Sequence, residues 1–107
     1  MKVDWDIIIV GGGTAGLSAA QYGARANLKT LLIEEVATGG LTLVISDLEN
    51  YPGFPEPIEG YDLAQRFTKQ AERFGAEIKS GSVTEIAPKD GFFEVSMDDE
   101  VLTSYAV

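Results

Sequence analysis

The 107-residue sequence contains no cysteine and no histidine. Without cysteine, the chain carries no disulfide framework, no thiolate metal site and no redox-active thiol pair of its own. Without histidine, it lacks the usual general base and the commonest transition-metal ligand. We therefore expect neither a catalytic residue nor a metal ligand in this chain.

Positive charge and long apolar runs are also scarce. Eight lysines and arginines stand against seventeen aspartates and glutamates, which gives a formal net charge of −9. An acidic chain is a poor match for nucleic acid or an anionic membrane, because both require a cationic surface. No apolar run is long enough to span a bilayer, and the first residues lack the pattern of a secretory signal. We expect one globular domain in the cytoplasm, with neither nucleic acid nor membrane as a partner.

The residues that are present are organised around a glycine-rich turn. The apolar run at residues 7–10 stops at Gly11, and small residues compatible with a helix follow from position 14. A strand, a tight turn and a helix in this order open a dinucleotide-binding fold. Gly11 would allow the turn, and Gly16 would let the helix lie close to the strand. Gly13 would let the backbone approach a pyrophosphate held by the helix N-terminus.

Glu34 directly follows the next predicted strand, at residues 29–33. An acid about 20 residues beyond the glycines is where a ribose hydroxyl is bound in such folds. An isolated acid at a strand end would simply be solvated, and we interpret Glu35 in that way. Paired with the glycine turn, Glu34 is predicted to be a ribose ligand.

Residues 36–60 hold several glycines and prolines without a long periodic pattern. A connection of this length is uncommon unless it is functional or disordered, and its apolar content argues against disorder. We predict an ordered loop around a large, partly apolar ligand, the alternative being a packed structural loop. Residues 42–47 fit either a short helix or a strand.

The remaining patterns complete the fold prediction. A helix is expected from Tyr61 to Gly75, with Leu63, Phe67, Ala71 and Phe74 on its apolar face. A third parallel strand follows at residues 76–78, and three short antiparallel strands follow at residues 83–86, 92–96 and 101–105. Asp90-Gly91 is a hairpin signal between the first two of these. The predicted fold class is α/β, a Rossmann-like parallel sheet followed by a three-stranded antiparallel meander.

Four segments, taken together, resemble the N-terminal part of a bacterial or archaeal thioredoxin reductase, in the pyridine nucleotide-disulfide oxidoreductase family. They are residues 6–17, 23–28, 49–55 and 70–78. The glycine turn is shared by many flavin and nicotinamide enzymes. The sequence Asn50-Tyr51-Pro52-Gly53-Phe54-Pro55, placed after Gly39-Gly40, is far more specific.

The resemblance implies an FAD site. The implied cofactor-binding residues are Gly11, Gly12, Gly13, Thr14, Ala15 and Gly16 at the pyrophosphate, Glu34 at the ribose, Gly40, Leu41, Thr42 and Asn50 along the ribityl chain and flavin, and Val83 near the adenine. Leu41 departs from the family, which commonly has glutamine there. Residues 43–46 depart as well, because they replace a threonine-rich segment and leave fewer hydroxyls near the flavin.

The same resemblance identifies what this chain lacks. The family's Cys-x-x-Cys pair lies in a second, NAD(P)H-binding domain, and a C-terminal segment completes its FAD domain. The family is a homodimer that acts on a small redox protein. Residues 1–107 are thus expected to be a partial FAD-binding domain that is inactive alone. This domain is expected to bind FAD weakly or not at all. Truncation would leave the strand at residues 7–10 as an open edge, so self-association is expected through it or through the final strand.

Two other functions fit the sequence. One is a ferredoxin–NADP reductase of thioredoxin-reductase type, which lacks the cysteine pair. The other is a nucleotide-binding or interaction module with no chemistry of its own.

Overall fold

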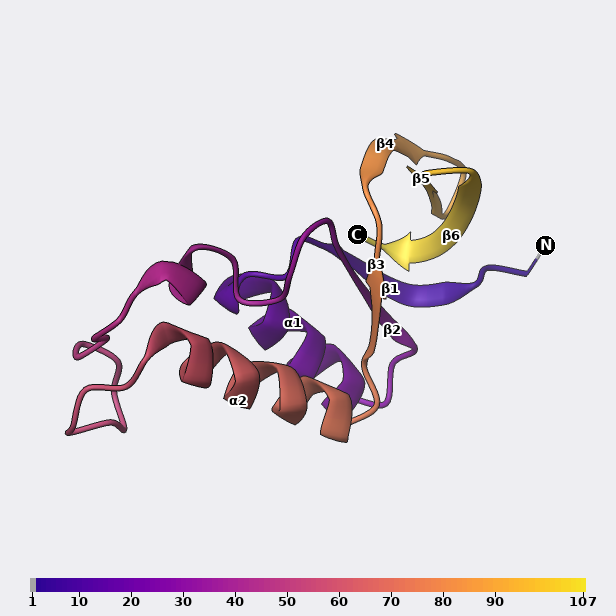
Figure 1. The fold of residues 1–107 in the computed structure, drawn as a ribbon. Coiled ribbons are helices and arrows are strands. Elements are labelled where there is room, and N and C mark those ends of the chain that lie inside the picture. Colours follow the sequence, from indigo (N-terminus) through magenta and orange to yellow (C-terminus); the bar gives the residue numbers. More distant parts are fainter. Residues whose placement is uncertain (1) are drawn as a thin grey trace.

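The computed structural model describes residues 2–107 and has three layers, with helices on one face of a parallel sheet and a curled meander on the other (Figure 1). Its elements in chain order are β1 (Trp5–Val10), α1 (Thr14–Arg25), β2 (Thr30–Glu34), the 3-10 helix η1 (Gly40–Val44), α2 (Gly60–Arg73), β3 (Glu77–Ser80), β4 (Val83–Pro88), β5 (Phe93–Met97) and β6 (Glu100–Ala106).

These strands form one sheet in the order β3-β2-β1-β6-β5-β4. The strands β1, β2 and β3 are parallel, with Ile8 opposite Leu31 and Leu32 opposite Ile78. The strands β4, β5 and β6 pair antiparallel as a meander. The predicted fold class, a Rossmann-like parallel sheet followed by an antiparallel meander, is therefore confirmed.

The two parts of the sheet join where β6 pairs in parallel with β1, with Trp5 opposite Ser104 and Ile7 opposite Ala106. The carboxylate of Asp4 reinforces the junction by accepting hydrogen bonds from the N–H of Thr103 at 3.2 Å and its hydroxyl at 3.0 Å. The expectation that β1 is an open edge is wrong, because the β5–β6 hairpin returns the chain alongside it. The final strand β6 is likewise interior, and the sheet edges are β3 and β4.

The helix α1 packs closely on the sheet because its buried positions are small. A Cβ atom on Gly23 would lie 2.9 Å from the hydroxyl of Thr30 on β2. The helix ends before Asn27, whose φ of 65° places it in the left-handed region that breaks the helix. Small residues therefore set the distance between α1 and β2.

Each face of the parallel strands carries its own apolar cluster. On the helix side, Leu17 and Leu32 pack with alanines of α1 and α2. On the meander side, Ile8 and Leu31 pack with Val95 of β5. Complete burial of each large aliphatic side chain stabilises the fold by about 1.5–3 kcal/mol. The two clusters explain why β1 and β2 are almost continuously apolar, as expected for strands covered on both faces.

The connection between β2 and α2 is structured locally. Residues 40–44 form η1, so of the segment 42–47, for which the sequence left a helix or a strand open, residues 42–44 are helical and residues 45–47 belong to neither. Leu48 and Ile58 form an antiparallel bridge, and Tyr51 contacts the rings of Phe54 and Phe67. Beyond η1 this connection projects away from the strands, at the N-terminal end of α2 (Figure 1).

The helix α2 and the meander follow the sequence patterns. Leu63 and Ala71 are buried on α2, Phe67 and Phe74 are half-buried, and Gly75 has a φ of 105° just beyond the helix. Gly91, with a φ of 85°, lies in the turn between β4 and β5. In the part of the chain that the structure describes, no helix is long and apolar enough to cross a membrane.

Candidate functional site

The glycine turn between β1 and α1 has the close packing that its glycines allow. Gly11 has a φ of 105°, and its N–H donates to the carbonyl of Ile33 at 2.9 Å. A Cβ atom on Gly16 would lie only 2.0 Å from the carbonyl oxygen of Gly11. Backbone cannot yield to such an overlap, so only glycine at position 16 lets α1 begin this close to the turn.

The N-terminus of α1 presents unbonded donors. The first hydrogen bond of the helix runs from the N–H of Leu17 to the carbonyl of Gly13 at 2.9 Å, and no side chain caps this end. The N–H groups of Thr14, Ala15 and Gly16 therefore have no acceptor within the helix. A Cβ atom on Gly13 would meet nothing within 4 Å, so the turn is open on that side of Gly13. This arrangement is suited to an anion such as a phosphate.

Glu34 lies against the same turn. Its Oε1 accepts a hydrogen bond from the N–H of Gly12 at 2.8 Å. Its Oε2 accepts from the N–H groups of Glu35 at 2.8 Å and Val36 at 3.2 Å. The side chain is half-buried, so the carboxylate is fixed by backbone donors while still reaching solvent.

A hollow of about 140 Å³ lies at the carboxyl ends of the parallel strands. This is where α/β sheets bind ligands. It is lined by Val10, Gly11, Ile33, Glu34, Glu35, Gly81 and Val83. The fold thus brings together three predicted cofactor-binding residues that lie far apart in the sequence, namely Gly11, Glu34 and Val83.

Sequence reasoning missed the other residues of this hollow. Gly81 follows the third parallel strand directly, and its position at a strand's carboxyl end is the signal that could have identified it. Its N–H donates to the carbonyl of Glu34 at 3.1 Å, and a Cβ atom there would lie 1.9 Å from Cε of Met97. Glu35, interpreted as solvated, lines the hollow as well.

The loop after β2 returns to the glycine turn at Gly39 and Gly40. The N–H of Gly39 donates to the carbonyl of Gly12 at 2.7 Å, and a Cβ atom on Gly40 would lie 3.3 Å from Cα of Gly13. Leu41 and Thr42 then continue along η1. Asn50 is exposed, and it lines neither this hollow nor a larger one along α2.

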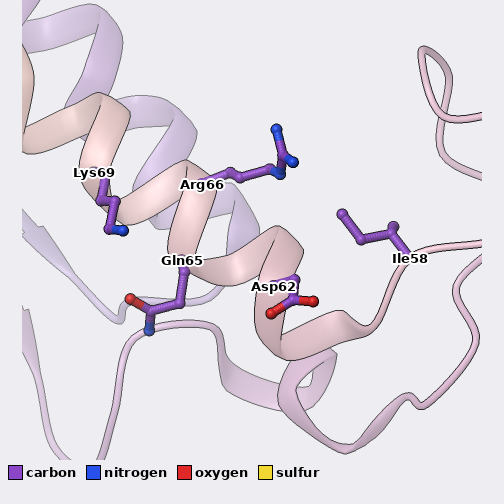
Figure 2. A pocket seen from close by; sticks show the side chains of 5 residues that line it. All are labelled: Ile58, Asp62, Gln65, Arg66 and Lys69. Atoms are coloured by element: carbon purple, nitrogen blue, oxygen red, sulfur yellow. The ribbon is translucent and has the colours of Figure 1, made fainter.

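A larger hollow, of about 390 Å³, lies along α2. It is lined by Ile58, Asp62, Gln65, Arg66 and Lys69. Figure 2 shows that the polar ends of these side chains do not converge on one point. No predicted site residue lines it, so size alone does not identify the functional site.

No cluster of metal-binding side chains is found among residues 2–107. No group of three or more carboxylates, cysteines or histidines is placed to hold a metal ion there. What the site offers is a set of backbone donors, one fixed carboxylate and a small hollow. This chemistry is suited to binding a nucleotide.

The sequence is similar to those of known proteins. The family model described as pyridine nucleotide-disulphide oxidoreductase matches residues 5–106. The thioredoxin reductase of Treponema pallidum is 50% identical over 107 residues, covering 100% of this chain and 35% of that protein. Mitochondrial thioredoxin reductase 1 of Arabidopsis thaliana is 42% identical over 106 residues, covering 94% of this chain and 28% of that protein.

The fold also resembles that of a solved structure. A crystal structure of Lactococcus lactis thioredoxin reductase in the FR conformation matches with a TM-score of 0.91 at 33% identity. The match covers 95% of this chain and 33% of that one. This chain thus spans about a third of the length of these relatives. By the match to residues 5–106, the chain belongs to the pyridine nucleotide-disulphide oxidoreductase family, in which the relatives named here are thioredoxin reductases.

Proposed function

We propose that residues 1–107 are part of the FAD-binding domain of a thioredoxin-reductase-like oxidoreductase. The observation that carries this proposal is the hollow shared by Gly11, Glu34 and Val83, next to the unbonded donors at the start of α1. The family as a whole uses FAD, and the relatives named above are thioredoxin reductases.

The adenosine diphosphate half of FAD fits the residues present. The N–H groups of Thr14, Ala15 and Gly16 would hold the pyrophosphate, because they have no acceptors within the helix. Glu34 would accept from the ribose, and Val83 would lie beside the adenine. Gly12 would support the turn rather than bind phosphate, since its N–H is already bonded to Glu34.

The residues proposed to bind the flavin half of FAD are more exposed to solvent. Gly40 lies against Gly13, so Leu41 and Thr42 are close enough in sequence to line a ribityl chain that leaves the pyrophosphate. Asn50 would contribute from the same loop. Leu41 is 87% exposed and offers no hydrogen bond, which supports weak retention of the flavin by this chain alone.

The chain's own part in the reaction is binding and orientation. FAD, when bound, supplies the capacity to accept electrons from a nicotinamide and pass them to a disulfide. No side chain here performs that transfer, because the sequence has neither cysteine nor histidine. NAD(P)H would bind a domain outside residues 1–107, and the substrate of the whole enzyme would be a small redox protein such as thioredoxin.

Calorimetric titration with FAD, ADP and NADH, side by side, tests this proposal. We expect ADP and FAD to bind, FAD only weakly because the flavin half gains few contacts, and NADH to bind more weakly still. Glu34→Gln should weaken ADP binding about tenfold, as expected for loss of one hydrogen bond to a charged group. Glu72→Gln serves as the matched control, because Glu72 is exposed on α2 and lines neither hollow. Binding of NADH without FAD would instead favour a nicotinamide module, and binding of none of the three would exclude a nucleotide site.

A further inference from the structure

The carboxylate of Glu34 is largely occupied by the protein itself. A carboxylate offers about four acceptor positions. Three are taken by the N–H groups of Gly12, Glu35 and Val36. The side chain therefore stabilises the local backbone even without a ligand, and it can accept about one further hydrogen bond.

The hydrogen bonds of the Glu34 side chain are not what pairs β2 with β3. The main chain of Glu34 is already paired with Ser80 of β3, and its carbonyl accepts from the N–H of Gly81. What the side chain adds is a tie to Gly12. This residue is buried, and a Cβ atom on it would lie 3.1 Å from Cβ of Glu34.

Gly12 passes this tie on to the loop after β2. Its N–H is held by Glu34, and its carbonyl holds the N–H of Gly39 at 2.7 Å. Gly39 is buried in turn, and a Cβ atom on it would lie 2.7 Å from Cβ of Ala64 on α2. The carboxylate and Gly39 thus hold opposite ends of the Gly12 residue.

We infer that Glu34 is a positioning residue for the loop at residues 39–44, acting through Gly12, in addition to its proposed contact with ribose. The carboxylate fixes the Gly12 main chain, and Gly12 fixes Gly39 and with it the start of η1. A ligand hydroxyl that bonds Glu34 therefore acts on the loop that lines the other half of the site. The ligand part of this inference rests on the proposed function, whereas the tie through Gly12 does not.

Amide hydrogen exchange of the ligand-free chain, measured by NMR, tests the tie. In Glu34→Gln the amide cannot accept from Gly12 on one side and from Glu35 and Val36 on the other. We expect exchange at Gly12 and Gly39 to accelerate about tenfold. Glu35→Gln removes the same charge one residue away and should leave both amides unchanged. The Leu32 amide in β2 should be unchanged in both variants, which reports an intact sheet.

An accelerated Gly12 amide with an unchanged Gly39 amide would overturn the inference. A second measurement uses the unsubstituted chain and stays informative even where a variant fails to fold. Saturating ADP should slow exchange at Gly39, although ADP carries no flavin. If ADP binds and Gly39 does not respond, the coupling is wrong. If ADP does not bind at all, the proposed function fails, and the Glu34→Gln comparison still decides the tie through Gly12.

Discussion

Gly16 of α1 packs directly against the carbonyl oxygen of Gly11, with 2.0 Å left for a Cβ atom. We predict that Gly16→Ala forces α1 away from the turn. The expected loss in free energy of unfolding is about 1–3 kcal/mol, as for overpacking in a core. Urea denaturation followed by circular dichroism measures this loss, and an unchanged midpoint would mean that the helix start can shift freely.

Gly13→Ala is the matched comparison, because it places the same methyl group three residues earlier. Gly13 has a φ of −70°, and its Cβ would meet nothing within 4 Å. Stability should therefore change by less than about 0.5 kcal/mol. ADP affinity should fall at least about tenfold, since the methyl group would project from the turn proposed to hold the phosphate. Normal ADP binding by Gly13→Ala would show that no phosphate lies on this turn.

Asn27, just after α1, adopts a left-handed conformation with a φ of 65°. Asparagine tolerates this region better than most residues, and glycine tolerates it best. We predict that Asn27→Gly leaves stability unchanged or raises it slightly, whereas Asn27→Ala lowers it by about 1 kcal/mol. Thermal unfolding of the two variants in parallel checks the order. An alanine variant as stable as the glycine variant would contradict the assigned backbone conformation.

Leu41 can be replaced at little structural cost, because 87% of its side chain is exposed. Leu41→Gln should leave the free energy of unfolding within about 0.5 kcal/mol of the original. It adds an amide beside the proposed flavin seat, so FAD affinity should rise while ADP affinity stays the same. An equal rise for both ligands would place the new contact on the adenosine half instead.

Self-association is expected to involve η1 rather than the edge strand β4. Leu41 and Val44 are 87% and 82% exposed, and a spacing of three puts them on one side of a 3-10 helix. The edge strand β4 carries Pro88 and a register shift between Val83 and Glu85, and such features discourage pairing.

We predict association at micromolar concentration in sedimentation velocity experiments, and its loss in Val44→Asp. The control Val101→Asp changes another exposed valine, on β6. If Val44→Asp associates as the original does while Val101→Asp does not, the contact lies on the meander.

Local patterns in the sequence were sufficient for the parts of the fold that local physics determines. The strand at residues 7–10, the glycines and the small residues of α1 specify a β–α–β start, and Gly75 and Asp90-Gly91 mark a helix end and a hairpin. The spacing of Glu34 from the glycines placed it near the turn, where it binds Gly12.

Pairings between distant strands were not predictable from those patterns. Nothing in the residues of β6 indicates that Ser104 and Ala106 lie beside β1, because any half-buried strand would show the same alternation. The curl of the meander over Ile8 is equally invisible in sequence, although it creates the wall of the hollow at Val83. Gly81 differs in this respect, because its position directly after β3 was a signal available in the sequence.

The hydrogen bonds between Asp4 and Thr103 join residues 99 positions apart. During synthesis, β6 therefore follows β1 out of the ribosome by about 5–20 seconds at typical elongation rates. For most of that interval β5 has not been synthesised, so it cannot cover Ile8 and Leu31. A nascent chain arrested before β5 would present this apolar face to chaperones and proteases, so completion of the meander, rather than formation of the glycine turn, ends the vulnerable period.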